Sequence, residues 1–461
     1  MSLKVIEALA SHIGKYPYDQ VVYVCGFIQY FYLVAFVSCI LSSYPLGLVY
    51  CHILHPSKVS SEARQIVGLV WGLCFGWICF QWHLFSIIGT TTLCYMLTNY
   101  VDPKYVHRPL MILVQKVTYV ALSVHDGKGR DEKHLSSEQK QEQLKQVPSP
   151  LQYFGYVLHY SMLLSGPACT YRQYKDFING SCTEVRITPV LKKSLVSLLC
   201  LLLFFNVTPR FPISLNADEH FIGSQPFLWR LLYSWISIIA IRMQYYFAFK
   251  TGEAINNLCG LGFSGYDNDG NALWDSMANV SILRVEFGLN FKMVLENWNI
   301  STVLWLRRYW SSSYNNFHIW SIYDRLTNHR TLGVFVLTAV WHGFYGGYYL
   351  TFITCQLMVE AARAVRRTLR DKFQRTPLLS RVYDVITCVT TVVCLTYATV
   401  PFALLDLWAG LRFWRSMYYF GHVIAFLVLL MLRGKSTRAK VLTESPDTNQ
   451  NGVASIDKKY Q

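Results

Sequence analysis

Two polar residues stand inside apolar sequence and have the chemistry for proton transfer. His342 lies in TLGVFVLTAVWHGFYGGYYLTF, and Asn299 lies in ENWNISTVLWLRRYW. Ionisable and amide groups are costly to place in lipid, so they are typical of functional sites there. A histidine of ordinary pKa, about 6.5, suits a general base for a hydroxyl nucleophile. An amide can orient that hydroxyl or stabilise a developing oxyanion.

The neighbours of His342 distinguish it from other histidines in apolar stretches. Trp341 precedes it, and Gly343, Gly346 and Gly347 follow among aromatic residues. Glycines at this spacing let a second backbone or a ligand approach closely, although helix packing alone also explains them. The other histidines of such stretches are interpreted as hydrogen-bonded structural residues: His83, His159 and His422.

These residues require a membrane-embedded scaffold, and the composition predicts one. The chain has 461 residues, of which 52% are hydrophobic and only 15% charged, too apolar for an ordinary soluble protein. Apolar stretches predict an all-α polytopic membrane protein of about nine to eleven membrane helices. The clearest are 21–54, 66–98, 190–208, 228–249, 332–358, 382–408 and 412–432, with weaker ones near 110–124, 151–169 and 300–322. A helix starting near residue 332 would carry His342 about 15 Å along its axis, near the bilayer midplane.

The formal net charge of +15 is better explained by membrane topology than by nucleic-acid binding, because the basic residues lie in short segments between spans. The basic loop 363–375 and the segment 433–440 after the last span are both expected in the cytosol. We therefore divide the chain into a membrane-embedded domain, 1–435, and a disordered cytosolic tail, 436–461. The tail ends in KKYQ, which matches a dilysine signal for retrieval to the endoplasmic reticulum.

Other features of the sequence restrict the possibilities further. The charged stretch 126–145 is expected to form an exposed loop or surface helix between two membrane subregions. Most of the thirteen cysteines lie in apolar runs, and no disulfide framework or metal-ligand spacing is visible, so we predict no metal site. The first twenty residues lack the pattern of a cleavable signal peptide.

Several longer motifs extend over residues 110 to 432. They are VHDG from Val124 with Lys128 and Arg130, SGPACTYRQY from Ser165, YYFAFKTGEAINNLCGLGFSGYD from Tyr245, the block 296–306, VWHGFYGGYYLTF from Val340, and YDVITC from Tyr383. Together they resemble the membrane-bound O-acyltransferase family. The resemblance is greatest to its lysophospholipid acyltransferase branch, which acts on lysophosphatidylethanolamine and lysophosphatidylserine.

The resemblance implies a function for the two polar residues. His342 would be the catalytic histidine and Asn299 its partner, in an all-helical fold whose spans enclose a tunnel. Acyl-CoA, the co-substrate, would enter from the cytosol and the lysophospholipid from the bilayer, with no other cofactor. One departure is visible, because Gly346 stands where relatives have proline, which puts the local helix kink and acyl selectivity in question.

Substrate contacts are expected from aromatic and basic residues near these positions: Trp298, Trp341, Lys292, Arg307 and Arg308. The three basic residues would meet the phosphates of CoA, although they equally suit topology anchors. Carboxylates that could meet an ethanolamine or serine amine are Asp267, Asp269 and Glu286. A lysophosphatidylcholine acceptor remains open.

Two alternatives remain at this stage. A family member that acylates a protein or another lipid would share the reacting pair, but the FYxDWWN motif of sterol-acylating members is replaced here by ENWNIST. A transporter would place polar residues along a pathway, yet no internal repeat is visible. The sequence gives no prediction of oligomeric state, and no nucleic-acid partner is expected.

Overall fold

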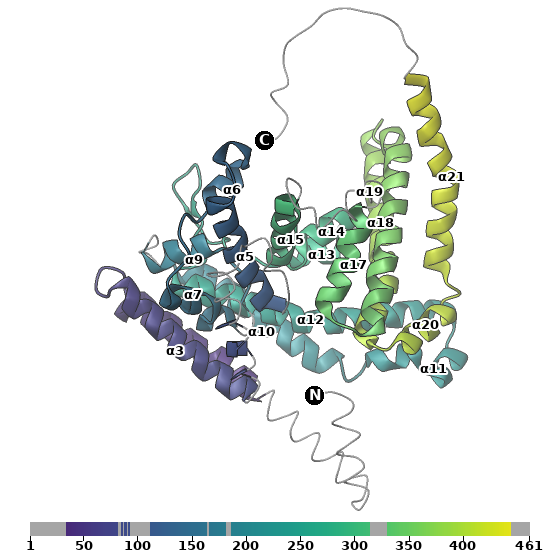
Figure 1. The fold of residues 1–461 in the computed structure, drawn as a ribbon. Coiled ribbons are helices and arrows are strands. Elements are labelled where there is room, and N and C mark those ends of the chain that lie inside the picture. The colour runs from purple at the N-terminus through teal and green to yellow at the C-terminus, as the bar shows by residue number, and fades with distance from the viewer. Residues whose placement is uncertain are drawn as a thin grey trace, which may run out of the picture.

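The computed structural model describes residues 34–81, 84–85, 87–89, 91–92, 111–163, 166–180, 186–313 and 330–443. These residues are predominantly helical (Figure 1), which confirms the all-α prediction. The strands β1 (Gly265–Tyr266) and β2 (Ala272–Leu273) form one small antiparallel hairpin, in which Gly265 pairs with Leu273.

The helices of the described chain fall into an N-terminal and a C-terminal series. The first comprises a helix over Val34–Ile53 that ends in η1 (Val49–Ile53), then α3 (Ser61–Phe80), α5 (Met111–Lys128), η3 (Glu132–His134), α6 (Ser137–Glu142), α7 (Pro150–Val157), α8 (Tyr160–Leu163), α9 (Tyr171–Ile178) and α10 (Ile187–Val207). The second comprises η4 (Ile213–Ala217), α11 (Glu219–Ser224), α12 (Phe227–Cys259), α13 (Ile282–Glu286), α14 (Phe291–Asn297), α15 (Ile300–Ser313), α17 (Arg330–His342), α18 (Gly346–Phe373), α19 (Pro377–Leu404), α20 (Leu407–Ser416) and α21 (Phe420–Thr443).

The long helix α12 connects the two halves of the structure. Helices α3, α5, α7 and α9 lie on one side and α17 to α21 on the other, with α10 and α12 between them (Figure 1). Along α12, Ile238 belongs to the core of the C-terminal group, Tyr246 to a central cluster and Ile255 to the N-terminal core. Its 33 residues correspond to about 50 Å of helix, enough to reach both cores.

Short polar sequences set the beginnings of several helices. The side chain of Thr170 accepts a hydrogen bond from the backbone of Gln173, whose own side chain closes a capping box on α9. Ser149 and Gln152 form the same arrangement at α7, where Pro150 occupies the first helical position. These caps satisfy backbone N–H groups that have no partner inside the helix.

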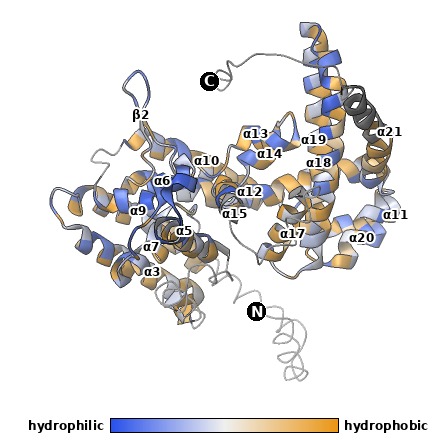
Figure 2. Ribbon diagram, turned by 45° about the horizontal axis from the view of Figure 1, so that its top comes forward, coloured by the Kyte–Doolittle hydropathy of each residue, from blue (hydrophilic) through white to orange (hydrophobic). Residues whose placement is uncertain are grey.

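Three helices among the described residues are long and apolar enough to cross a bilayer, namely 34–53, α10 and α19. The pair α20 and α21 adds a fourth if counted as one span, although it bends by 74°. Hydrophobic residues are spread over both groups of helices (Figure 2). The described chain thus supports a polytopic membrane protein, and three or four spans meet this measure among the described residues, fewer than the nine to eleven predicted for the whole chain. Two of the predicted spans are broken.

One of those broken spans is 412–432, which is divided between α20 and α21. Tyr418 and Tyr419 both have positive φ angles, 55° and 51°, at the bend. A continuous helix cannot contain such residues, so the prediction of one straight span was wrong here.

The basic segment 363–375 was predicted as a loop, and this was wrong for most of its length. Helix α18 continues to Phe373, so only Arg375 of the predicted basic residues lies in the turn to α19. Alanine and arginine are strong helix formers, and the basic residues Arg370 and Lys372 suit the carboxyl end of a helix.

The structure describes one of the two predicted polar segments, 126–145, completely, and the other, 436–461, only in part. Within 126–145, α5 ends at Lys128 and is followed by η3 and the short helix α6, which confirms a loop with a surface helix. The predicted tail from Ser436 begins inside α21, which continues to Thr443. Residues 444–461, and with them Lys458 and Lys459, lie outside the described part of the chain.

Candidate active site

Asn299 lies between α14 and α15 in a conformation that few side chains adopt. Its φ angle is 50°, in the left-handed region, where asparagine is among the best tolerated residues other than glycine. Its carbonyl accepts hydrogen bonds from the amides of Thr302 (3.0 Å) and Val303 (3.2 Å), so it starts α15. The side chain is half-buried. The backbone conformation is thus one reason for an asparagine at this position.

A second asparagine, Asn279, holds the start of α15 in place. Its backbone carbonyl accepts from the amide of Ile300 at 2.8 Å, and its side-chain Oδ1 accepts from the amide of Ser301 at 3.0 Å. These bonds satisfy two N–H groups that the first turn of a helix leaves unpaired. An isolated bridge between Val280 and Trp298 joins the same two segments. Residue 299 is therefore fixed against residues 279–280.

The buried carboxylate of Glu253 fixes residues 279–280 in turn. Its Oε1 accepts from the backbone amides of Asn279 (2.9 Å) and Val280 (3.2 Å). Lys250 donates to both carboxylate oxygens (3.0 and 2.9 Å), and the ammonium of Lys193 lies 3.3 Å from Oε2. Glu253 is 0% exposed, and a buried charge is tolerated only when paired and hydrogen-bonded. The network therefore ties α10 and α12 to the start of α15.

His342 is the last residue of α17, at a break between two helices. Gly343 has a φ angle of 122°, a conformation that favours glycine, and α18 begins three residues later at Gly346. The prediction of one continuous helix over 332–358, with the histidine in its interior, was therefore wrong. The break leaves His342 at a helix end, beside backbone that turns away from it.

The two later glycines allow close backbone packing at this break. The amide of Gly347 donates to the carbonyl of Leu405 at 2.7 Å, and a Cβ atom on Gly347 would lie 2.1 Å from the carbonyl oxygen of Pro401. A Cβ on Gly346 would lie 2.6 Å from Cβ of Leu407. This confirms that the glycines admit another backbone. Gly346 is also the first residue of α18, a position that suits proline as well, so the break does not depend on proline.

An aromatic cluster surrounds the imidazole of His342. Its ring stacks on Phe352 at 5.1 Å between centroids and meets Phe402 edge-on at 5.1 Å, with Trp341 at 4.7 Å and Tyr348 at 5.4 Å. The residue is half-buried. Among the described residues, none forms a hydrogen bond with the imidazole.

The histidines expected to be structural behave differently. His422 hydrogen-bonds to Thr354 at 3.0 Å and to Tyr397 at 2.6 Å, and the buried His159 hydrogen-bonds to Ser161 at 2.9 Å. Both interpretations are confirmed, while His83 lies outside the described residues. His342 therefore differs from His159 and His422, because no side chain of the described residues hydrogen-bonds to its imidazole.

Tryptophans connect the two candidate residues. Trp305 of α15 packs against Trp341, with ring centroids 6.2 Å apart, and its indole nitrogen donates to Thr118 at 2.7 Å. Trp298, beside Asn299, packs on Tyr245, Tyr246 and Phe249 of α12. Helix α15, which begins directly after Asn299, thus touches the residue preceding His342. Substrate contacts of Trp298 and Trp341 stay predictions.

The three basic candidates lie in two different environments. Lys292 and Arg307 are exposed, and both lie near Glu296, with Lys292 at 3.9 Å. Arg308 is buried and pairs with the carboxylate of Asp126 at 2.7 Å. The ion pair of Arg308 and Asp126 connects α15 with α5. Unlike Lys292 and Arg307, Arg308 is almost inaccessible to solvent.

Sequence reasoning missed the anchoring residues Glu253, Lys250 and Asn279. Asn279 is 2% exposed, and nothing in its local sequence indicates that it is buried. The available signal was the charged pair Lys250 and Glu253, placed between aromatic and aliphatic residues of one long helix. Charges in such a setting are expected to have partners.

Comparison with known proteins identifies a family and several relatives that match most of the chain. Residues 74–400 match the model of MBOAT, the membrane-bound O-acyltransferase family. The chain is 34% identical over 452 residues to Lysophospholipid acyltransferase 6 of Drosophila melanogaster, covering 87% of this chain and 61% of that protein. It therefore spans about three fifths of that relative's length.

Two further relatives are covered more fully. The chain is 33% identical over 478 residues to Membrane-bound glycerophospholipid O-acyltransferase 2 of Homo sapiens, covering 93% of this chain and 89% of that protein. It is 31% identical over 375 residues to Lysophospholipid acyltransferase of Schizosaccharomyces pombe, covering 76% and 71%. The matched region of the family model includes Glu253, Asn299 and His342.

Replacing Glu253 by glutamine should destabilise the protein strongly, because Lys193 and Lys250 would lose their buried counter-charge. Breaking a buried pair typically costs about 3–5 kcal/mol. Thermal unfolding of the detergent-solubilised chain measures the effect. Glu296→Gln is the matched control, since its pairs with Lys292 and Arg307 are exposed and worth about 1 kcal/mol or less. Equal shifts in the two variants would contradict the anchoring role of Glu253.

Proposed function

The chain belongs to the membrane-bound O-acyltransferase family, and we propose that it transfers a fatty acyl group from acyl-CoA to the free hydroxyl of a lysophospholipid. The names of the relatives support a lysophospholipid or glycerophospholipid acceptor, and such a reaction would serve phospholipid remodelling. The observation that carries the proposal is the imidazole of His342, which lies at a helix break without a hydrogen-bond partner among the described residues.

In the proposed mechanism His342 takes the proton of the lysophospholipid hydroxyl as that oxygen attacks the thioester carbonyl carbon. The carbon–sulfur bond then breaks, and the proton passes from the imidazole to the departing thiolate of CoA. The acyl group is transferred directly, with no covalent acyl-enzyme and no cofactor other than the co-substrate. The carboxyl end of α17 favours the positive charge that His342 carries between these steps.

Asn299 is proposed to orient the hydroxyl or to donate to the developing oxyanion. A preorganised donor is worth most where water is excluded. The aromatic rings around His342 and Trp298 provide such surroundings. Lys292 and Arg307 are our candidates for contacts with CoA phosphates because both are exposed, whereas Arg308 is committed to Asp126.

We further propose an acceptor with an ethanolamine or serine head group, on the basis of the sequence motifs. Two of the three carboxylates considered for its amine have other partners. Glu286 accepts from Arg242 at 2.7 and 2.6 Å and from Tyr246 at 2.5 Å. Asp267 accepts from Asn271 and from the amide of Asp269 within its own hairpin loop, which lowers its pKa. Asp269 is exposed. None of the three is favoured by its geometry as the amine partner.

The variant His342→Ala should lose acyl transfer by about 10²- to 10⁴-fold, the usual contribution of a general base. Its expression and membrane insertion should be unchanged. The measurement is the release of CoA thiol from oleoyl-CoA that depends on added lysophospholipid. Phe402→Leu is the control, because it removes ring packing on His342 without removing a proton acceptor. Activity of His342→Ala within a few-fold of wild type would remove the histidine from the mechanism.

Variants of Asn299 separate its backbone role from its chemistry. Glycine keeps the positive φ, and aspartate keeps the shape but loses the amide donor. If the amide acts on substrate, both Asn299→Gly and Asn299→Asp should lose about 10²-fold in kcat while their unfolding temperatures stay near wild type. Full activity of Asn299→Gly would show that only the backbone conformation matters.

The head-group proposal predicts faster transfer to lysophosphatidylethanolamine and lysophosphatidylserine than to the choline or inositol forms. A site that hydrogen-bonds an amine discriminates against a trimethylated head, since its polar groups are then left unpaired. All four acceptors are compared at matched concentrations with oleoyl-CoA. A preference for choline or inositol would reject this branch while leaving the acyl transfer itself unaffected.

We propose an endoplasmic reticulum location, supported by the terminal lysines of the sequence. Replacing Lys458 and Lys459 by serine should let part of the protein leave that membrane, as followed by microscopy of tagged full-length chains. An unchanged distribution would show that the dilysine sequence does not determine location.

A further inference from the structure

A pocket of about 590 Å³ opens where α11, the start of α12 and the junction of α20 and α21 meet. None of its lining residues belongs to the cluster around His342 or to the segment around Asn299. Its walls contribute three arginines, Arg230, Arg412 and Arg415, and a single carboxylate, that of Glu219. The lining is therefore positively charged overall, and it is separate from the candidate reaction centre.

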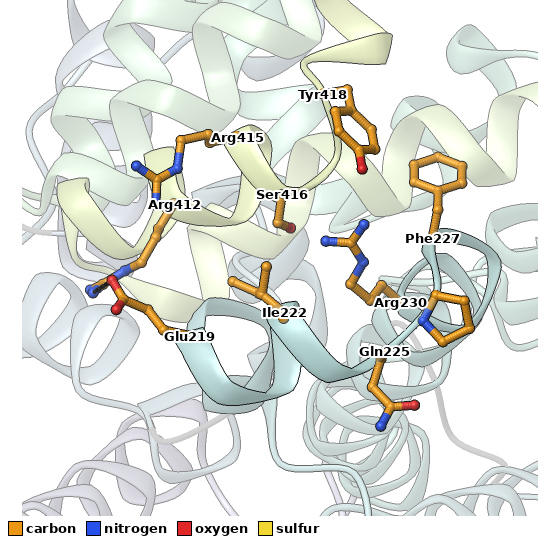
Figure 3. Close-up of a pocket in the computed structure, with 11 residues that line it drawn as sticks. Glu219, Ile222, Gln225, Phe227, Arg230, Arg412, Arg415, Ser416 and Tyr418 are labelled. Carbon is orange, nitrogen blue, oxygen red and sulfur yellow. Dashed lines mark hydrogen bonds and ion pairs between the residues drawn. The ribbon is translucent and has the colours of Figure 1, made fainter.

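Arg230 is the most informative residue of this pocket. It is 7% exposed, and its guanidinium points inward toward Ser416 and Tyr418 (Figure 3). Its Nε is buried without an acceptor, and no carboxylate of the described residues pairs with it. The ring of Tyr418 lies 5.9 Å from the guanidinium carbon. An ionised group buried in this way requires a counter-charge, which a bound anion would supply.

The other two arginines leave the positive charge largely uncompensated. Arg412 approaches Glu219 only at 3.5 Å, and both side chains are partly exposed. Its Nε is also buried without an acceptor, while Arg415 is exposed at the rim. Arginine presents several N–H donors in a planar fork that matches the oxygens of a phosphate. The lining of the pocket thus includes guanidinium donors for an oxyanion from two elements, Arg230 of α12 and the two arginines of α20 (Figure 3).

Exposed apolar and aromatic residues lie on the elements that form the pocket, and one of them, Tyr418, lines it. Leu228 is 75% exposed, and Trp408 and Tyr418 are each 70% exposed. Aromatic side chains of this kind are enriched where a membrane protein meets the lipid head groups. A ligand that combines an anionic head with an apolar body would therefore find arginines for its head and exposed apolar side chains on the same helices for its body.

We propose that this pocket binds the phosphate head group of an anionic membrane phospholipid, as a site additional to the one for the substrates. Three arginines against one carboxylate favour a head group with net negative charge over a zwitterionic one. The inference depends on membrane embedding alone and is independent of the proposed acyl transfer.

The test is native mass spectrometry of the detergent-purified full-length chain, titrated with phosphatidylinositol or with phosphatidylcholine of the same acyl chains. The wild-type chain should bind phosphatidylinositol more tightly than phosphatidylcholine. Arg230→Gln should weaken that binding by about tenfold or more, because charge-assisted hydrogen bonds are lost. Arg415→Gln should also weaken phosphatidylinositol binding. Because Arg415 is exposed, this variant replaces Arg230→Gln in the test if Arg230→Gln fails to fold. Arg210→Gln is the control, since Arg210 is exposed and donates to the backbone of Asn206.

Three results would overturn the proposal. One is unchanged phosphatidylinositol binding by both pocket variants, and another is equal binding of phosphatidylcholine by wild type. The third comes from inorganic phosphate, because full displacement of the lipid by phosphate at millimolar concentration would assign the pocket to a soluble anion. The experiment measures lipid binding, so its result does not depend on whether the proposed acyl transfer takes place.

Discussion

The burial of one carboxylate, that of Glu253, is the constraint on which the candidate site depends. A charge at this depth is stable only with full compensation, and two lysines and two backbone amides provide it. Because these groups come from α10, α12 and residues 279–280, pairing the carboxylate also joins those segments. Asn279 then fixes the first turn of α15, and Asn299 takes its position from that turn.

Both candidate catalytic residues lie where a helix is interrupted. Backbone groups exposed by an interruption inside a membrane protein must be satisfied by other parts of the protein. At Asn299 the partner is Asn279, and at the start of α18 the partner is the carbonyl of Leu405, reached because Gly347 has no Cβ. At each interruption the surrounding structure holds the helix end in place. Rigid placement of donors is what catalysis by preorganised groups requires.

Much of the architecture and the candidate residues could be predicted from the sequence, because their signals are local. Apolar length predicted α10 and α19 in the membrane, and the polar stretch after Lys128 predicted a loop with a short helix. His342 and Asn299 stood out as polar groups in apolar surroundings, and the glycines after His342 indicated close backbone contact. His159 and His422 were correctly interpreted as structural for the same reason, since a buried imidazole usually finds a partner.

The tertiary structure alone decided which charges meet and where helices break. Nothing local in the sequence pairs Arg308 with Asp126, which are 182 residues apart, or Glu253 with Lys193. The interruption after His342 and the bend before Phe420 also escaped the apolar pattern, because hydropathy records composition and not backbone conformation. The amides of Gly343 and Tyr418 bond to carbonyls three or four residues earlier, but the start of α18 depends on a distant segment, because the amide of Gly347 donates to the carbonyl of Leu405. That partner lies 58 residues further along the chain, so its effect appears only once the chain is folded.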